Sequence, residues 1–465
     1  MTVATTDSAQ QFIEAYEAAE RDFAGPSWLA PLRKAAIARF GELGLPTTRH
    51  EEWRFTNLSP LARTSFAPAL AADLSLADIR EFLVDERWPR LVCVNGRYDA
   101  RLSLTKDLPA GVSLRGLAER LRENAPGLEG QLAQHADTRG QAFTALNTAM
   151  FSDGASLRVG RNVALETPIL LLFVATAAAE PTVTHPRVLL VGEQSANFTV
   201  IERYVSLGAS TYFTNAVTEI VAGPNAVIDH YKSQRESEQA FHIAAQRLQL
   251  DRDSRVSSHS LSIGGRLVRN NVHAMLAGAG ADANLNGLFV TRGDQHVDNH
   301  LRVEHVSPRC ASWEFYKGIL DGRSSGVFTG RIFVHKQAQK TDAKQSNDNL
   351  LLSTEAQIDT KPQLEIFADD VRCTHGATIG QVDHDAIFYL RSRGVPADAA
   401  RSMLIYAFAG ESLGQIKVEP LRDQFQKLLL ERLPHGKMLA AGSPLFYGAD
   451  FARHVKALDR RREST

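Results

Sequence analysis

The chain has 465 residues and a formal net charge of -1, and 44% of its residues are hydrophobic and 23% charged. These are ordinary globular values that allow a sizeable core, and the near-neutral charge gives no argument for binding nucleic acid or an anionic membrane surface. Residues 1–20 are polar and lack the basic and apolar regions of a signal peptide. The longest apolar run, residues 168–179, is too short to span a bilayer. We therefore expect no nucleic-acid partner and no membrane association.

The three cysteines, Cys93, Cys310 and Cys373, lie far apart in the sequence and form no Cys-x-x-Cys pair. This spacing argues against a disulfide framework and against a structural zinc site built from this chain alone. A reducing cytoplasm is therefore the expected location.

Residues 1–150 have a mostly helical pattern. Apolar residues recur at helical spacing over residues 29–43, and a second helical window covers residues 77–84. Residues 91–94 differ, because they predict a strand that Asn95-Gly96 turns tightly into a second strand. We expect an N-terminal, mostly helical region.

Residues 151–390 contain almost no helical pattern and instead form a series of short alternating segments. A strand series of this length is typical of a sandwich, a barrel or a β-solenoid. The repeated corner of small residues favours a solenoid, in which each coil turns sharply and returns a side chain to a shared stack. These corners occur at irregular intervals, at residues 192–196, 223–226, 278–281, 353–356 and 376–377.

Residues 391–465 turn helical again. Pro396 stands at a plausible first helical position, and an apolar stripe follows it up to Phe408. A second helix is expected to end at Leu433-Pro434. The helix over residues 396–411 could dock a partner or pack against its own C-terminal neighbour, and the two interpretations are compatible.

Several catalytic motifs are absent from the sequence. It contains no Gly-x-x-x-x-Gly-Lys-Ser/Thr loop for phosphates and no Gly-x-Ser-x-Gly nucleophile elbow. It also lacks His-Glu-x-x-His and Gly-x-Gly-x-x-Gly. If ATP drives the function, a partner must hydrolyse it.

Cys373 and His375 are the strongest candidates for chemistry. They are two residues apart in an expected strand, so their side chains point to the same side. A thiolate beside an imidazole suits iron or zinc, but two ligands do not close a site, so others must come from elsewhere in the chain or from another chain. The alternative is structural, with the cysteine packed as a small hydrophobe beside a hydrogen-bonded histidine.

A second candidate set is His296, Asp298 and His300, which share one strand face. Two histidines and an aspartate could bind a metal. A polar solvent-facing strand or an interface ladder explains the pattern better, because outward strand faces are normally polar. The role of His305, which follows shortly after, stays open.

A set of motifs in order between residues 328 and 395, together with a motif near the N-terminus, resembles the SufB/SufD family. The N-terminal motif and Cys-Thr-His-Gly resemble the SufD branch of that family. The motifs are Glu51-Glu-Trp-Arg-Phe-Thr, Phe328-Thr-Gly-Arg-Ile, Asp359-Thr-Lys-Pro-Gln-Leu-Glu-Ile, Ala368-Asp-Asp-Val-Arg-Cys-Thr-His-Gly-Ala-Thr-Ile-Gly and Phe388-Tyr-Leu-Arg-Ser-Arg-Gly-Val.

This resemblance implies a mainly β fold, a right-handed parallel β-helix flanked by N- and C-terminal helical regions. The expected regions are residues 1–150 (mostly helical), 151–390 (β-helix core) and 391–465 (helical, docking the ATPase). It also implies a non-catalytic scaffold in an iron–sulfur cluster assembly complex with a SufB-like subunit and a SufC-like ATPase, in which the partner hydrolyses ATP.

The resemblance also assigns residues. His375, with Cys373 next to it, would hold iron or a nascent Fe–S cluster, transiently and shared with the SufB-like subunit. The helix over residues 396–411 would dock the SufC-like ATPase, with contacts from Met403, Leu404, Tyr406 and Phe408. A homodimer is possible where the SufB-like partner is missing, because the same edge could pair with itself.

Two rival functions remain open. One is a self-contained metal-dependent enzyme on a β-solenoid, using His296, Asp298 and His300. The other is a purely structural β-helix subunit, in which Cys373 and His375 matter only for packing.

Overall fold

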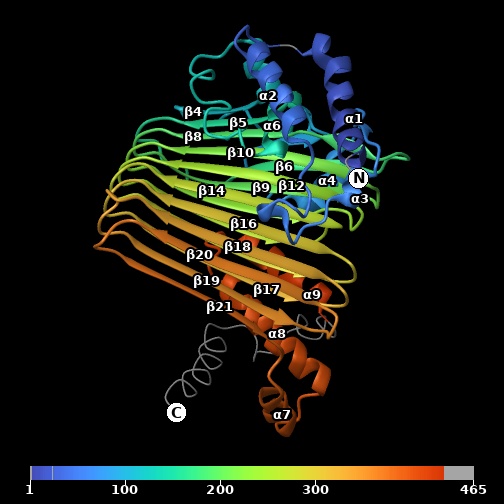
Figure 1. Ribbon diagram of the computed structural model, residues 1–465, viewed down its shortest axis with the longest axis vertical. Helices are drawn as coiled ribbons and strands as arrows, with labels where there is room; N and C mark the ends of the chain where they lie inside the picture. The colour runs from blue at the N-terminus through green and yellow to red at the C-terminus, as the bar shows by residue number, and fades with distance from the viewer. Residues whose placement is uncertain (1–2, 24, 434–465) are drawn as a thin grey trace.

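Two long β-sheets form the body of the structure, and the computed structural model describes residues 3–23 and 25–433. Consecutive strands alternate between the sheets, and each strand from β8 to β19 pairs in parallel with the strand two positions further along the chain. The chain is therefore a parallel β-solenoid of about eight coils. Helices lie at both ends of the chain (Figure 1). The predicted fold class is confirmed.

The first sheet has 11 strands and the second has 10. The first contains β1 (Ala67–Pro68), β4 (Val112–Gly116), β5 (Gly154–Val159), β7 (Thr182–Thr184), β8 (Arg187–Gly192), β10 (Tyr212–Ala222), β12 (Phe241–Leu250), β14 (Leu267–Leu276), β16 (His296–His305), β18 (Ser325–Val334) and β20 (Gln357–Ile366). The second contains β2 (Arg90–Val94), β3 (Arg97–Tyr98), β6 (Ile169–Thr176), β9 (Asn197–Leu207), β11 (Val227–Arg235), β13 (Arg255–Ser262), β15 (Asp282–Thr291), β17 (Ala311–Leu320), β19 (Asp342–Leu351) and β21 (Arg372–Gly380).

The corners between the sheets explain the small residues seen in the sequence. Ser195 and Asn225 have φ of 58° and occupy equivalent corners of successive coils. This left-handed conformation suits short polar residues that can hydrogen-bond locally. Ala196 and Ala226 follow and are fully buried, so only a small side chain fits there. The predicted corner at Gly376-Ala377 is wrong, because both residues lie inside β21.

The N-terminal helices pack on the outer face of the first sheet. Phe12, Phe40 and Phe143 join Phe213 of β10 and Phe241 of β12 in one apolar cluster. The helices are α1 (Val3–Ala19), α2 (Leu29–Leu43), α3 (Ser59–Ala62), α4 (Leu76–Ile79), α5 (Leu117–Arg122) and α6 (Ala142–Met150), with the short 3-10 helices η1 (Glu20–Asp22), η2 (Glu51–Trp53) and η3 (Arg80–Phe82).

The local predictions for this region hold. Helix α2 has the predicted bounds, and it ends where Gly44 adopts φ 61°. The predicted helical window over residues 77–84 corresponds to α4 and η3. Strands β2 and β3 form the predicted antiparallel hairpin, with Asn95 and Gly96 both at positive φ.

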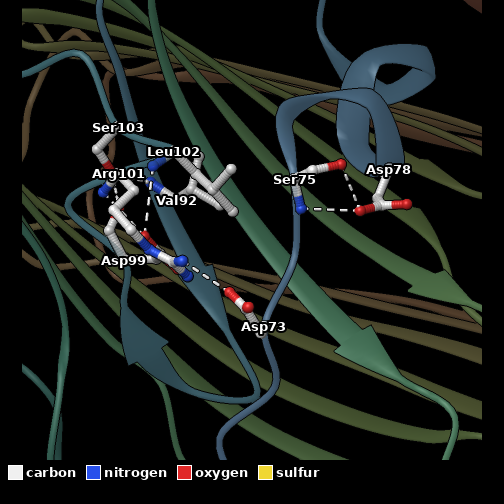
Figure 2. Close-up of polar contacts among 8 residues, drawn as sticks. All are labelled: Asp73, Ser75, Asp78, Val92, Asp99, Arg101, Leu102 and Ser103. Atoms are coloured by element: carbon white, nitrogen blue, oxygen red, sulfur yellow. Dashed lines mark hydrogen bonds and ion pairs between the residues drawn. The ribbon is translucent and has the colours of Figure 1, made fainter.

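Figure 2 shows how the segment before α4 is fastened to the loop after this hairpin. Arg101 donates to Asp73 at 2.6 Å and to Asp99 at 2.9 Å. Ser103 accepts the N–H of Val92 at 2.9 Å, which holds the loop against β2. Ser75 and Asp78 form a capping box that begins α4.

Up to residue 433, the C-terminal region forms three helices, and the last two cover the outer face of the second sheet. They are α7 (His384–Ser392), α8 (Ala397–Leu413) and α9 (Glu419–Arg432). Ile405 of α8 and Phe425 of α9 pack with Leu288 of β15 and Ile319 of β17. Helix α7 has no buried residue and lies beyond the last coil (Figure 1). Residues 434–465 of the predicted C-terminal region lie outside the described residues.

None of the helices in the described part of the chain has both the length and the apolar character needed to cross a membrane.

Candidate functional site

The last coil of the solenoid ends both sheets. Strand β20 pairs with β18 and β21 pairs with β19, and neither has a second neighbour among residues 3–23 and 25–433. Most of β21 is exposed, whereas residues of β19 are alternately buried and half-buried or exposed. The outer edges of both strands therefore present backbone N–H and C=O groups with no strand partner.

Cys373 and His375 lie on the same face of β21. Their register partners on β19 are Ala343 and Gln345, which are both buried. Because strand side chains alternate, both residues face the interior of the solenoid at its open end. Cys373 is half-buried and packs against an apolar cluster that includes Ala343 and Ile332, while His375 is exposed. The structure thus brings the two predicted residues together.

A buried polar column leads from the interior to His375. Gln345, its neighbour on β19, donates to the Oε2 of Glu314 on β17 at 2.6 Å. Glu314 is fully buried, and burial raises the pKa of its carboxyl to about 7. Gly330 leaves room for the pair, since a Cβ there would lie 2.1 Å from the Nε2 of Gln345.

Sequence reasoning missed Glu314 and Gln345. They share a register column with His375 across three coils, yet they lie far apart in the sequence. An alignment of the coils with each other could have found them, because every coil repeats the same inward positions.

The electrostatics of Cys373 favour a protonated thiol. Burial raises its pKa, the Asp342 carboxylate raises it further, and the backbone N–H of Ala343 opposes both effects. A metal would therefore have to displace the thiol proton, since only the thiolate is a good ligand. Within the described residues, no group of three or more His, Cys, Asp or Glu side chains is arranged to hold a metal ion. Cys373 and His375 supply one sulfur and one nitrogen donor, so a complete site needs further donors, from elsewhere in the chain or from a second chain.

The second candidate set, on β16, is engaged by the N-terminal motif. Asp298 accepts from the hydroxyl of Thr56 at 2.6 Å and forms an ion pair with Arg269. Arg269 also contacts His300, because its Nη2 lies 2.8 Å from the Nδ1 of the His300 ring. His296 lies 2.9 Å from the Thr56 hydroxyl.

The side chains of His296, Asp298 and His300 therefore form a latch, meaning that their contacts hold residues 51–56 against the sheet, rather than an open metal site. The guanidinium of Arg269 lies 3.8 Å from the ring centre of Trp53, which clamps residues 51–56 onto the sheet. Burial lowers the pKa of His300 to about 4, so this side chain is neutral at physiological pH. His305 is fully buried, and its Nε2 lies 2.9 Å from the Ser312 hydroxyl.

The four predicted docking residues lie on α8 with different exposures. Met403 is buried in the chain's own core, while Leu404, Tyr406 and Phe408 are half-buried against it. Lys317 of β17 donates to the carbonyl of Phe408 at 3.2 Å. The internal packing of α8 is therefore observed, and partner contacts by these residues stay a prediction.

Two exposed aromatic residues that sequence reasoning did not select lie on α7. Phe388 is 72% exposed and Tyr389 is 51% exposed. They belong to a motif already noted in the sequence, but a family motif by itself does not separate surface residues from core residues.

Two protein-family models match consecutive parts of the chain. The family model described as SUF system FeS cluster assembly, SufBD core domain, matches residues 173–408. The model described as SufBD protein N-terminal region matches residues 6–171.

Individual relatives align over most of both chains. An iron–sulfur cluster assembly SufBD family protein of Synechocystis is 36% identical over 86% of this chain and 90% of its own length. The iron–sulfur cluster assembly protein SufD of Escherichia coli is 34% identical over 88% of this chain and 94% of its own. SufD of Bacillus subtilis is 26% identical over 92% of this chain and 99% of its own. With both family models matched in order and these relatives aligned nearly end to end, the chain belongs to the SufBD family of iron–sulfur cluster assembly proteins.

Proposed function

We propose that the chain is a SufD-like, non-catalytic scaffold subunit that pairs with a SufB-like subunit and a SufC-like ATPase. In this proposal, iron or a nascent Fe–S cluster is held at the interface with the SufB-like subunit. The observation that carries it is the open end of the solenoid, where Cys373 and His375 face the interior beside the two free strand edges.

The free edges support pairing with another solenoid. An unpaired strand edge is a template for a strand of another chain. Strand β20 offers 10 residues and β21 offers 9, and Pro362 removes one N–H from the first. Exposed apolar residues at the same end, Phe367 and Ile379, would be buried by such pairing. A second copy of this chain could use the same edges when the SufB-like subunit is absent.

The donor chemistry suits iron as cargo rather than as a resident cofactor. A thiolate and an imidazole are both good ligands for iron and for Fe–S clusters. Because this chain supplies two donors, the partner would supply the remaining ligands. The cluster would then be released when the interface between the two subunits opens. Because the pKa of Cys373 is raised, its thiol keeps a proton that must be released when the metal binds.

The C-terminal helices support docking of the ATPase. Phe388 and Tyr389 of α7 are exposed aromatic residues of the kind that anchor protein interfaces. Leu404, Tyr406 and Phe408 on α8 are half-buried and keep some surface for a partner, whereas the buried Met403 would act by supporting the helix. The three cysteines are free thiols, as expected for the cytoplasmic location that we propose.

The test is the His375→Ala variant of the chain, co-expressed with the SufB-like and SufC-like subunits and purified without oxygen. We expect the complex to assemble with unchanged mass and stoichiometry but to show much weaker cluster absorption than the wild type. The matched control is His50→Ala, which removes an exposed histidine whose ring, among the described residues, hydrogen-bonds only with Thr47. Wild-type cluster formation in the His375→Ala complex would refute the assigned role.

The Cys373→Ser variant separates a shared site from a purely structural subunit. We expect it to form clusters less well than the wild type, but better than His375→Ala. If both variants form clusters normally, the open end acts only in packing.

A further inference from the structure

A cavity of about 310 Å³ lies on the outer face of the first sheet, whereas Cys373 and His375 face the interior of the solenoid. Residues of β12, β14, β16, β18 and the edge strand β20 form its floor, and residues of the segments 51–55 and 137–141 line its other side. Its volume is in the range of small-molecule sites and too small for a folded partner. This cavity has no part in the proposed cluster chemistry.

A column of basic side chains runs across the cavity. Arg247, His273, Arg302 and Arg331 are register partners on four successive strands of the sheet, and all four line the cavity. Neighbouring strands lie only about 4.8 Å apart. Burial lowers the pKa of His273, so the like charges directly opposite each other are Arg302 and Arg331. Such pairs are destabilising, so the column needs negative charge nearby.

The chain supplies only part of that charge. Glu304 lies 3.3 Å from His273 and 3.1 Å from Arg302, and its other oxygen lies 2.7 Å from His335. Arg331 is paired with Glu365 at 2.6 Å. The single carboxylate of Glu304 is thus shared among three basic groups.

Arg247 is the group left without a counter-ion. It is 5% exposed, forms no ion pair with any described residue, and among those residues it donates only to the neighbouring Gln246 carbonyl, at 3.3 Å. Burial lowers its pKa to about 10, which reflects the cost of keeping this charge out of water. Two acids that favour its charge are engaged elsewhere, because Asp137 pairs with Arg139 at 3.1 Å and Glu219, its register partner on β10, pairs with Arg187.

The three arginines share a further feature. The Nε atoms of Arg247, Arg302 and Arg331 are all buried and have no hydrogen-bond partner. Buried N–H donors almost always find an acceptor. Three arginines with an unsatisfied donor line this one cavity, which favours an acceptor-rich group there, although the Oδ1 of Asp298, an acceptor in the same lining, is also buried without a partner.

We propose that this cavity binds a small oxyanion, a molecule that presents phosphate or carboxylate oxygens to Arg247 and Arg302. Guanidinium groups match both kinds of oxygen with paired N–H donors. Asn271 and Thr329 line the same cavity and add amide and hydroxyl groups. Five acidic residues also line the cavity, and they would disfavour extended polyanions and so favour a compact ligand; they are Glu51, Glu52, Asp137, Asp298 and Glu365.

The test is calorimetric titration of the full-length chain with inorganic phosphate and, separately, with citrate, at constant ionic strength. We expect at least one of the two to bind, and the better of them identifies the oxyanion class. Arg247→Gln and Arg302→Gln should each weaken that binding about tenfold or more, because each removes charge-assisted hydrogen bonds. Arg302 is 43% exposed, so its variant serves if Arg247→Gln fails to fold.

The matched control is Arg323→Gln. Arg323 is 65% exposed, does not line the cavity and pairs with Asp294 at 2.8 Å. It should leave the affinity unchanged. Absence of binding for both phosphate and citrate overturns the proposal, and so does an equal loss of affinity in the Arg323→Gln control. Since the readout is binding to the isolated chain, failure here leaves the cluster-scaffold proposal untouched.

Discussion

Replacing Glu314 with glutamine tests the buried column beneath His375. Glu314 has no cationic partner, and burial raises the pKa of its carboxyl from 4.5 to about 7. The folded chain therefore favours the protonated acid. The Oε1 of Glu314 and the Oε1 of Gln345 have no other hydrogen-bond partner, so a neutral donor at position 314 suits the site. Glutamine resembles that neutral form in shape and hydrogen bonding.

The sign of the pH dependence follows from proton linkage. Between pH 4.5 and 7 the folded state keeps a proton on Glu314 that the unfolded state has lost, so stability falls as pH rises through this window. The full effect is about 3 kcal/mol, taking 1.36 kcal/mol for each pKa unit. Glu314→Gln removes this loss. We expect the variant to be more stable than the wild type by up to about 3 kcal/mol at pH 8 and equally stable below pH 4.5.

The assay is urea denaturation of wild type and variant at pH 4.5, 6 and 8, followed by circular dichroism. The matched control is Glu355→Gln, which changes an exposed glutamate and should shift stability little at any pH. A stability difference that does not grow between pH 4.5 and 8 would refute the argument, as would a variant less stable than the wild type at pH 8.

Three further predictions concern other parts of the chain. Glu219→Ala should destabilise it by about 3–5 kcal/mol in urea denaturation, because the fully buried Arg187 would lose its ion pair; a loss below about 1 kcal/mol would contradict this. Cys373 should be the first of the three cysteines to react with iodoacetamide, because the other two are buried. Its rate should keep rising above pH 9, since its thiol pKa is raised; a plateau below pH 8 would show a thiolate instead. Phe388→Ala together with Tyr389→Ala should leave the melting temperature of the isolated chain unchanged while weakening capture of the SufC-like ATPase, and unchanged capture would remove α7 from the proposed interface.

Local sequence was sufficient for several features that depend on neighbours in the chain, although the corner predicted at Gly376-Ala377 was wrong. Helix α2 follows from apolar residues at helical spacing and ends at Gly44, and the hairpin follows from Asn95-Gly96. The corners at Ala196 and Ala226 could be predicted because a tight coil accepts only small residues there. The Cys373–His375 pair could be chosen from its spacing, since alternate residues of a strand share a face.

The stacking of the coils decided which residues far apart in the sequence become neighbours in the structure. Glu314 and Gln345 lie beneath His375 only because β17, β19 and β21 pair in one register, and the basic column of Arg247, Arg302 and Arg331 arises in the same way. Coil lengths are irregular, so no fixed period in the sequence reveals which residues meet. A one-residue change of register would turn every side chain of a strand to the other face.

The sequence by itself favoured a solenoid through its corners of small residues and its resemblance to the SufB/SufD family, and it predicted the helical ends and the pairing of Cys373 with His375 from patterns within single segments. Only the tertiary structure decided that His296, Asp298 and His300 act as a latch for residues 51–56, and that Met403 is part of the core. Those outcomes depend on which surfaces pack together. Packing is set by burial summed over the whole molecule, which no single segment encodes.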